Sequence, residues 1–154
     1  MKIIESIDVA MDVTLISLHD MPADLNAVAD VFTRISAVGV DVDMISQCPL
    51  GGTHSGLSFT VQDAQFGEIL PIVSALRTEN KELGVSVSSG NCKISVFGQG
   101  MKGQPGIAAS VLSAAAAAGC DLRMITTSET DISLLVVKAD ADRALKAIES
   151  AFFA

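Results

Sequence analysis

The chain has 154 residues, of which 49% are hydrophobic and 4% aromatic, and its formal net charge is −8. Since nucleic-acid affinity comes mainly from clustered Lys and Arg, this acidic balance argues against a nucleic-acid partner, and equally against an anionic membrane surface. The hydrophobic share can bury a real core. Without Trp or Tyr, the largest core side chains are expected to be the phenylalanines: Phe32, Phe59, Phe66, Phe97, Phe152 and Phe153.

The first half of the chain predicts strand, helix, strand, strand, helix and strand, after a β-like segment at residues 2–9. Apolar residues spaced by three and four predict the helices, and alternation of apolar and polar residues predicts the strands. The predicted ranges are 13–18, 25–38, 41–47, 55–61, 64–79 and 84–88.

The second half predicts the same order but one strand fewer: 93–97, a helix at 105–118, 121–127, 130–137 and a helix at 140–152. Pro105 suits the first turn of its helix, where a missing N–H costs nothing. Because no residues remain after the last helix for a fourth strand, we predict that the N-terminal segment closes the second sheet.

The two halves are copies of one module. With an offset of 80, identical residues coincide without a gap in eight pairs, and after residue 48 the offset becomes 75. The coinciding residues of the first copy are Met21, Ala29, Val31, Ala37, Gly39, Asp41, Met44 and Ile45. The first copy carries about five extra residues around 49–53, a turn-rich insertion.

The predicted fold class is therefore α+β, with two ferredoxin-like βαββαβ modules in tandem and the N-terminal strand completing the second module's sheet. The first module is expected at 10–89, and the second at 90–154 together with 1–9. The acid at Glu5 interrupts any secretory apolar core, and the stretch 107–118 is too short to span a bilayer. Three widely spaced cysteines indicate no disulfide framework, so we expect a cytoplasmic protein.

The segment Gly98 to Gly103 spells G-x-G-x-x-G, the dinucleotide-binding fingerprint. Its glycines precede the helix instead of opening it, and the first copy has no glycine at the matching positions. A strand-to-helix turn ending in Pro-Gly is better suited to bind an anion such as an α-carboxylate, because backbone N–H groups at a helix N-terminus are unpaired. The alternative is a loop with no binding role.

Acids recur at the start of the second strand of each copy, Asp41 and Asp121 among them, and could pair with a ligand's ammonium group. The histidines, His19 and His54, have no metal-ligand spacing and no counterpart in the other copy. We expect no metal site, no cofactor and no catalytic residue.

Three motifs resemble a known family. Gly-x-Gly-Met-Lys-x-x-Pro-Gly-Ile at 98–107, Met-Ile-Thr-Thr-Ser-Glu at 124–129 and Val-Asp-Met-Ile-Ser-Gln at 42–47 look like the tandem ACT domains that end aspartokinases (aspartate kinases). The resemblance covers nearly the whole chain. It implies binding of lysine, threonine or both, feedback inhibition of a kinase domain, and, in some members, a free regulatory subunit that pairs with a kinase-containing chain.

The resemblance also implies the binding residues. The second copy's pocket would be formed by Met101, Gln104, Gly106, Ile107, Asp121, Ser128 and Glu129. The first copy's pocket would be formed by Asn26, Asp43 and Gln47.

Two departures from the family matter. Leu25-Asn26 stands where the family has Pro-Gly, so the first site is expected to be altered. Arg123 stands where an acid is common, which disfavours lysine and leaves threonine or another amino acid as the ligand. The chain has no kinase segment, so we expect a regulatory protein that is not an enzyme, either part of a kinase or separate from it, and a homodimer when no kinase is present. The alternatives are a ligand-free scaffold for subunit association and a small enzyme on the same fold.

Overall fold

The computed structural model describes residues 2–49 and 52–153. These residues form two compact units, which we call the first unit (residues 12–89) and the second unit (residues 1–11 and 90–154). Two strands, β1 (Ser6–Pro22) and β4 (Gly84–Phe97), give one part to each unit. The module bounds expected from the repeat, 10–89 and 90–154 with 1–9, stay a proposal, because compactness alone does not define a repeated unit.

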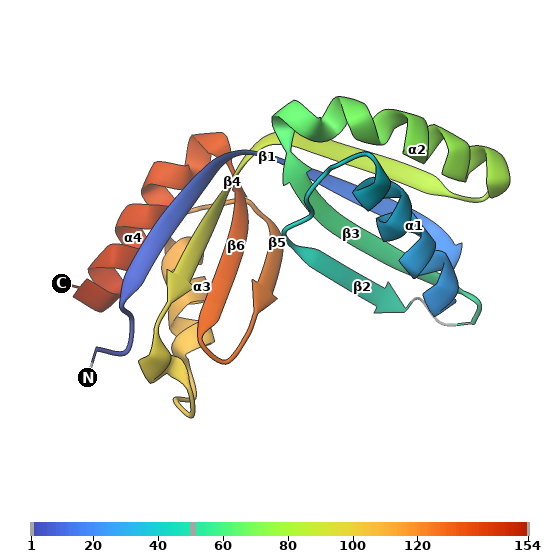
Figure 1. Cartoon of the computed structure of the whole chain (residues 1–154). Helices are drawn as coiled ribbons and strands as arrows, with labels where there is room; N and C mark the ends of the chain where they lie inside the picture. The colour runs from blue at the N-terminus through green and yellow to red at the C-terminus, as the bar shows by residue number, and fades with distance from the viewer. Residues whose placement is uncertain (1, 50–51, 154) are drawn as a thin grey trace. The chain divides into compact units, whose positions relative to one another are not determined.

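The first unit has the strand order β2-β3-β1-β4, with two helices on one face of the sheet (Figure 1). Its β1 and β3 are antiparallel, as are β2 and β3. The β1–β4 pair is also antiparallel, since His19 bonds Ser86 and Thr14 bonds Ser89. The other elements are α1 (Leu25–Ala37), β2 (Ile45–Pro49), β3 (His54–Gln62) and α2 (Phe66–Glu79), with a 3₁₀ turn at Asp63–Gln65.

The second unit repeats this order as β1-β4-β6-β5, with its two helices likewise on one face (Figure 1). Its N-terminal strand takes the place that the last strand has in the first unit, so the predicted fold class is confirmed. The other elements are α3 (Ile107–Ala117), β5 (Leu122–Thr127), β6 (Asp131–Val137) and α4 (Ala141–Phe153), with 3₁₀ turns at Gln99–Met101 and Lys138–Asp140.

Each unit has its own aliphatic core between sheet and helices. Phe59 is 1% exposed in the first core and meets Phe32 edge-to-face, with 5.5 Å between ring centroids. Ile4 lies in the second core and is 3% exposed. The expectation that all six phenylalanines are core residues was wrong for Phe153, which is 46% exposed at the end of α4.

Several element boundaries differ from those predicted. The strands predicted separately at 2–9 and 13–18, and at 84–88 and 93–97, are continuous as β1 and β4. Each bends through a residue of positive φ near the unit boundary, Asp12 at 58° and Gly90 at 70°. The strand predicted at 41–47 begins only at Ile45, and Pro105 lies before α3, not in its first turn.

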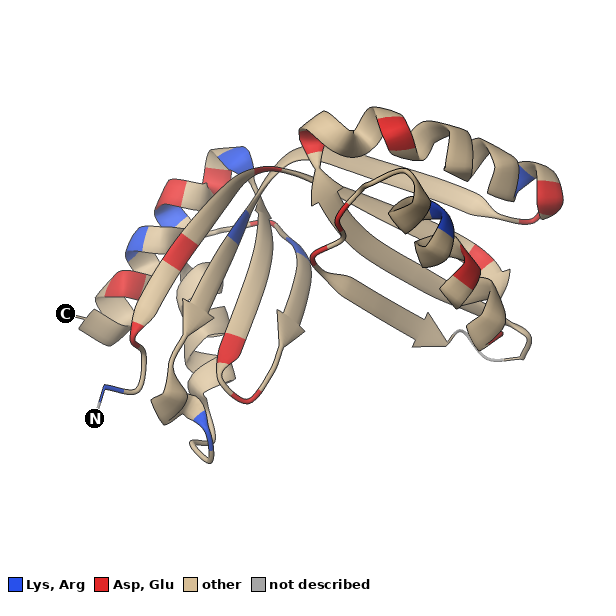
Figure 2. Cartoon of the chain, viewed as in Figure 1, with Lys and Arg blue, Asp and Glu red and all other residues tan. Residues whose placement is uncertain are grey.

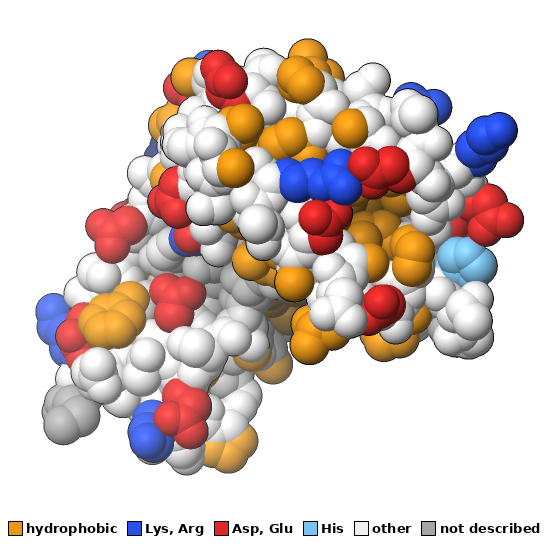
Figure 3. Space-filling model, turned by 45° about the vertical axis from the view of Figure 1, so that its right-hand side comes forward, with side chains coloured by type: hydrophobic (Ala, Val, Ile, Leu, Met, Phe, Trp, Pro, Cys, Tyr) orange, Lys and Arg blue, Asp and Glu red, His pale blue; other side chains and the backbone are white. Residues whose placement is uncertain are grey.

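Charged side chains are spread over both units. Along the ribbon of each unit, the positions of Lys and Arg are interspersed with those of acidic residues (Figure 2). Hydrophobic side chains also reach the surface at separate places (Figure 3), among them Leu25 and Leu70 of the first unit. Among the described residues, no helix is long and apolar enough to cross a bilayer.

Candidate amino-acid site

A cavity of about 420 Å³ lies in the second unit, between the loop from β4 to α3 and the turn from β5 to β6. It brings together residues about 25 positions apart in the chain. The residues that line it are Met101, Lys102, Gly103, Gln104, Pro105, Ile107, Ala108, Thr127, Ser128, Glu129 and Ile132.

Local sequence explains the loop wall. Met101 is buried and anchors a 3₁₀ turn, and the Gln104 N–H donates to its carbonyl at 3.0 Å. Gly106, which precedes α3, has φ of 91°, a backbone conformation that favours glycine. It gives no side-chain cap, and the first bond within the helix runs from the Ser110 N–H to the Gly106 carbonyl. The N–H groups of residues 107–109 are therefore not used by the helix.

The charges of the two walls are opposite. Free N–H groups and the helix dipole make the start of α3 favourable for an anion. On the opposite wall Glu129 supplies a carboxylate, which pairs with Lys102 at 3.1 Å. Both side chains are more than two-thirds exposed, so this ion pair is weak and a ligand can replace either partner. The arrangement suits a zwitterion whose carboxylate faces α3 and whose ammonium group faces Glu129.

The floor of the cavity is apolar. Met101 and Ile132 are buried in the second core, and Ile107 and Ala108 add aliphatic surface from the first turn of α3. A short aliphatic or hydroxylated side chain can lie on this surface. The side-chain ammonium group of a lysine ligand would be repelled by Lys102, the one cationic side chain among the described residues that line the cavity.

Five of the seven residues predicted for the second copy line this cavity: Met101, Gln104, Ile107, Ser128 and Glu129. Gly106 stands directly before α3, although it does not itself line the cavity. Their roles as ligand contacts stay predictions.

Asp121 lies elsewhere. It precedes β5, whereas the cavity lies beyond the other end of that strand, and six residues of strand span about 20 Å. Its N–H donates to the Asp140 carboxylate at 2.8 Å, and its own carboxylate pairs with Arg123 at 3.3 Å. Arg123 does not line the cavity either, so the cation that disfavours lysine there is Lys102.

The first copy differs at the start of its helix. Asp24 caps α1, and its carboxylate accepts a hydrogen bond from the Asn26 N–H at 3.0 Å. The position that an anion would occupy is therefore taken by the protein's own carboxylate. The sequence carries a signal for this cap at Asp24, since Asp is a preferred N-cap residue. The Asp43 N–H bonds the Thr60 carbonyl at 3.1 Å, and Gln47 is exposed on β2.

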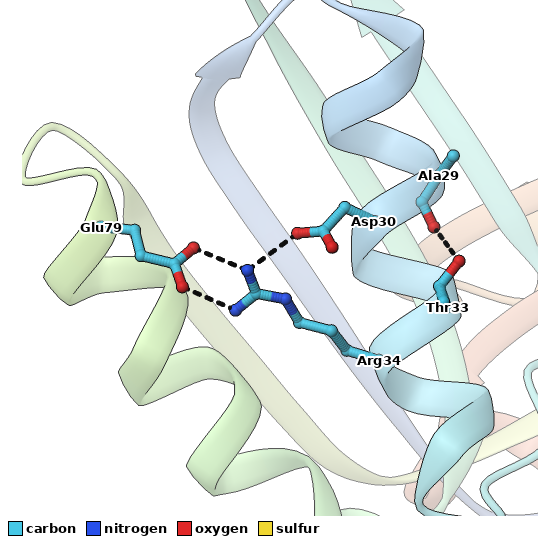
Figure 4. A network of polar contacts seen from close by, with 5 residues as sticks. All are labelled: Ala29, Asp30, Thr33, Arg34 and Glu79. Carbon is cyan, nitrogen blue, oxygen red and sulfur yellow. Dashed lines mark hydrogen bonds and ion pairs between the residues drawn. The ribbon is translucent and has the colours of Figure 1, made fainter.

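The first unit has a smaller cavity, of about 210 Å³, between α1 and α2. Beside it, Arg34 of α1 makes a two-pronged pair with Glu79 of α2, at 2.9 and 2.8 Å, and also bonds Asp30 (Figure 4). The hydrogen bonds that Arg34 donates to the carboxylates of Glu79 and Asp30 raise its pKa, so it is cationic at every pH of interest. Because both terminal nitrogens of Arg34 are hydrogen-bonded to Glu79, Arg34 connects α1 to α2 and is not available to bind a ligand.

The G-x-G of the dinucleotide-like motif has a structural role. A Cβ at Gly98 would lie 1.9 Å from the Ile3 carbonyl oxygen, and one at Gly100 would lie 2.7 Å from the Lys2 carbonyl oxygen. The N-terminal backbone thus occupies the space in front of these glycines, and α3 begins only at Ile107. The motif is used for close backbone packing and not as the first turn of a nucleotide-binding helix.

Each of the two histidines has a polar partner at the surface of the first unit. His54 pairs with Glu82 at 3.0 Å and His19 with Ser86 at 2.9 Å, all on exposed surface. Among the described residues, no three His, Cys, Asp or Glu side chains gather as a metal site would require.

Cys120 offers a test of the structure around Asp140. Burial, and then the charge of Asp140, raise the pKa of its thiol. At pH 8 iodoacetamide should therefore alkylate Cys120 several-fold more slowly than the exposed Cys48, as measured by peptide mass spectrometry. The thiol pKa is higher in the folded state than in the unfolded state, so folding favours the neutral thiol. The small stability that this preference contributes is present below pH 9 and is lost as the pH rises further. Equal alkylation rates of Cys120 and Cys48 in the folded protein would contradict the burial of Cys120. As a control, the two cysteines should react at equal rates in guanidinium.

Known proteins share this fold, and a family model matches part of the chain. Residues 94–152 match the ACT domain family model. The ligand-free regulatory subunit of aspartate kinase from Thermus thermophilus superposes with a TM-score of 0.89 at 28% identity, over 98% of this chain and 99% of that one. Aspartate kinase from Synechocystis superposes with a TM-score of 0.91 at 28% identity, over 99% of this chain and 27% of that one. An aspartokinase from Bacillus sp. (strain MGA3) is 26% identical over 141 residues, 92% of this chain.

The chain thus has two ferredoxin-like modules, and residues 94–152 of the second match the ACT domain family. The particular resemblance predicted from the motifs, to the ACT regulatory region of aspartokinases, is confirmed. The chain spans about a third of the length of the curated relatives it matches.

Proposed function

We propose that the chain is an allosteric amino-acid sensor that binds an amino acid of the lysine or threonine class and regulates an aspartate kinase activity. The observation that carries the proposal is the cavity at the start of α3, where free N–H groups face a carboxylate across an apolar floor. Solved relatives that match the chain over nearly their whole length are regulatory subunits of aspartate kinase, which supports a regulatory and non-catalytic role.

Threonine is the ligand that the cavity favours. Its carboxylate and ammonium groups suit α3 and Glu129, and its short side chain suits the floor of Ile107 and Ile132. Lysine would bring a second ammonium group to a cavity that already holds Lys102. The further parts of the proposal are a homodimer or a pair with a kinase-containing chain, and a cytoplasmic setting, with which cysteines in the thiol form agree.

A thermal-shift screen with the twenty amino acids tests binding. A ligand present at 100 times its Kd stabilises the folded protein by about 2.7 kcal/mol. We expect threonine to raise the Tm clearly and most other amino acids to leave it unchanged. If none of the twenty amino acids raises the Tm, the result favours the ligand-free scaffold alternative.

A matched pair of variants tests the location of the site. Ala108 and Ala109 are neighbours in the first turn of α3 and are both exposed, but only Ala108 lines the cavity. Ala108→Leu should fill the cavity and weaken threonine binding by about tenfold or more, equivalent to about 1.4 kcal/mol. Ala109→Leu should leave the Kd within about twofold. Calorimetric titration measures both, and equal affinities would place the site elsewhere.

A further inference from the structure

The N-terminal segment, residues 2–5, is packed against the loop that forms one wall of the cavity. The backbone contact at Gly98 and Gly100 leaves no room for a Cβ at either position. Two hydrogen bonds add to it: the Glu5 N–H donates to the Phe97 carbonyl at 2.8 Å, and the Glu5 carboxylate accepts from the Gln99 N–H at 2.9 Å. The segment is therefore fitted to one conformation of this loop.

The loop at 98–104 forms one wall of the cavity and is hydrogen-bonded to the turn that forms the other wall. Met101 lines the cavity and lies in the same core as Ile4. On the opposite wall, the Gly98 N–H donates to the Thr130 carbonyl at 2.9 Å, next to Ser128 and Glu129 in the turn. A change in the separation of the two walls must therefore change the surface against which the N-terminal segment packs.

The N-terminal segment also borders a hollow. A hollow of about 660 Å³ separates it from the end of α4 and is lined by residues 2–5 and 151–153. Across it, the Lys2 ammonium lies 6.0 Å from the ring centroid of Phe153, and both side chains are near the surface. The segment thus packs closely against the loop, is anchored in the core by Ile4, and borders a hollow next to the end of α4.

We infer that the packed N-terminal segment and the occupied cavity stabilise each other, so that this segment carries the signal of amino-acid binding out of the site. The inference rests on the proposed function. Linkage makes the effect reciprocal: the factor by which the packed segment tightens binding is also the factor by which the ligand stabilises the packed segment.

The variant Gly100→Ala tests one direction. Its new Cβ displaces the N-terminal segment but does not line the cavity. We expect the Kd for L-threonine, with L-lysine as a second probe, to rise about fivefold or more, within the usual range of allosteric coupling. The control is Gly67→Ala in α2, where a Cβ meets nothing within 4 Å and φ is not positive. Glu5→Ala removes only the acceptor for Gln99 and should give a smaller loss, about twofold.

Amide hydrogen exchange on the unaltered full chain tests the other direction and does not depend on the folding of a variant. Saturating threonine should slow exchange of the Glu5 N–H by the same factor by which Gly100→Ala weakens binding. The reference amide is that of Asn80, which bonds the Leu76 carbonyl at the end of α2 and should not change.

The outcomes separate the two proposals. If threonine binds, but Glu5 exchange and the Gly100→Ala affinity are both unaffected, the coupling is wrong and the sensor function stands. If the unaltered chain binds none of the twenty amino acids, the sensor function fails and the coupling fails with it. If binding and both expected shifts are found, both proposals are supported.

Discussion

A fragment of residues 90–154 should remain unfolded in isolation, whereas the same fragment extended by residues 1–11 at its C-terminal end should fold. The fragment has three strands and two helices of the second unit but lacks its N-terminal strand. A short Gly-Ser linker from residue 154 to residue 1 would make the order strand, helix, strand, strand, helix, strand continuous. The linker is geometrically reasonable, since residues 2–5 and 151–153 line one hollow.

The expected effect is large because the missing segment supplies both core and backbone pairing. Ile4 is buried in the second core and Ile7 packs against it, and a fully buried isoleucine contributes about 1.5–3 kcal/mol. Without the segment, β4 also loses a neighbouring strand along its second half. Together these losses approach the whole stability of a small domain, which is about 5–15 kcal/mol.

Urea unfolding followed by circular dichroism measures the difference. The permuted chain should give a cooperative transition, and the fragment without residues 1–11 should give none. A permuted chain with residues 1–11 in scrambled order controls for added length. A cooperative transition in the bare fragment would show that the N-terminal strand is dispensable.

Phe59→Ala is the single substitution expected to destabilise the first unit most. The ring is 1% exposed and packs edge-to-face against Phe32, so its removal opens a cavity among aliphatic neighbours. Such a change costs about 3–5 kcal/mol, which corresponds to a fall in Tm of roughly 10 °C for a chain of this size.

The matched control is Phe153→Ala, which removes the same atoms from a ring that is 46% exposed at the end of α4. It should lower the unfolding free energy by less than about 1 kcal/mol. Denaturant titration of the three proteins checks both values. Equal destabilisation by the two substitutions would contradict the burial assigned to these rings.

Regulation would follow from the difference in amino-acid affinity between two states of the chain. The cavity and the N-terminal segment share the loop at 98–104, so we expect a segment that does not line the cavity to distinguish an empty site from an occupied one. The first unit lacks an open anion site at its helix, because Asp24 already caps α1. The second unit is therefore the one in which we expect sensing.

The sequence alone determined the fold and supplied the candidate residues of the site. A repeat with offsets of 80 and 75 and a missing last strand predicted both modules and the role of the N-terminal strand. The family resemblance of the loop at 98–107 and the turn at 124–129 indicated five of the eleven residues that line the cavity, and their roles as ligand contacts stay predictions.

Only the tertiary structure decided the remaining points, since they depend on contacts between segments distant in sequence. Alternation in a strand says which side chains share a face but not which end of the strand meets a loop, so Asp121 and Arg123 were expected at a site from which β5 separates them. The structural role of Gly98 and Gly100 could likewise not be predicted from the sequence. A glycine required by close approach looks like any other until the backbone it touches, here Lys2 and Ile3, is brought against it.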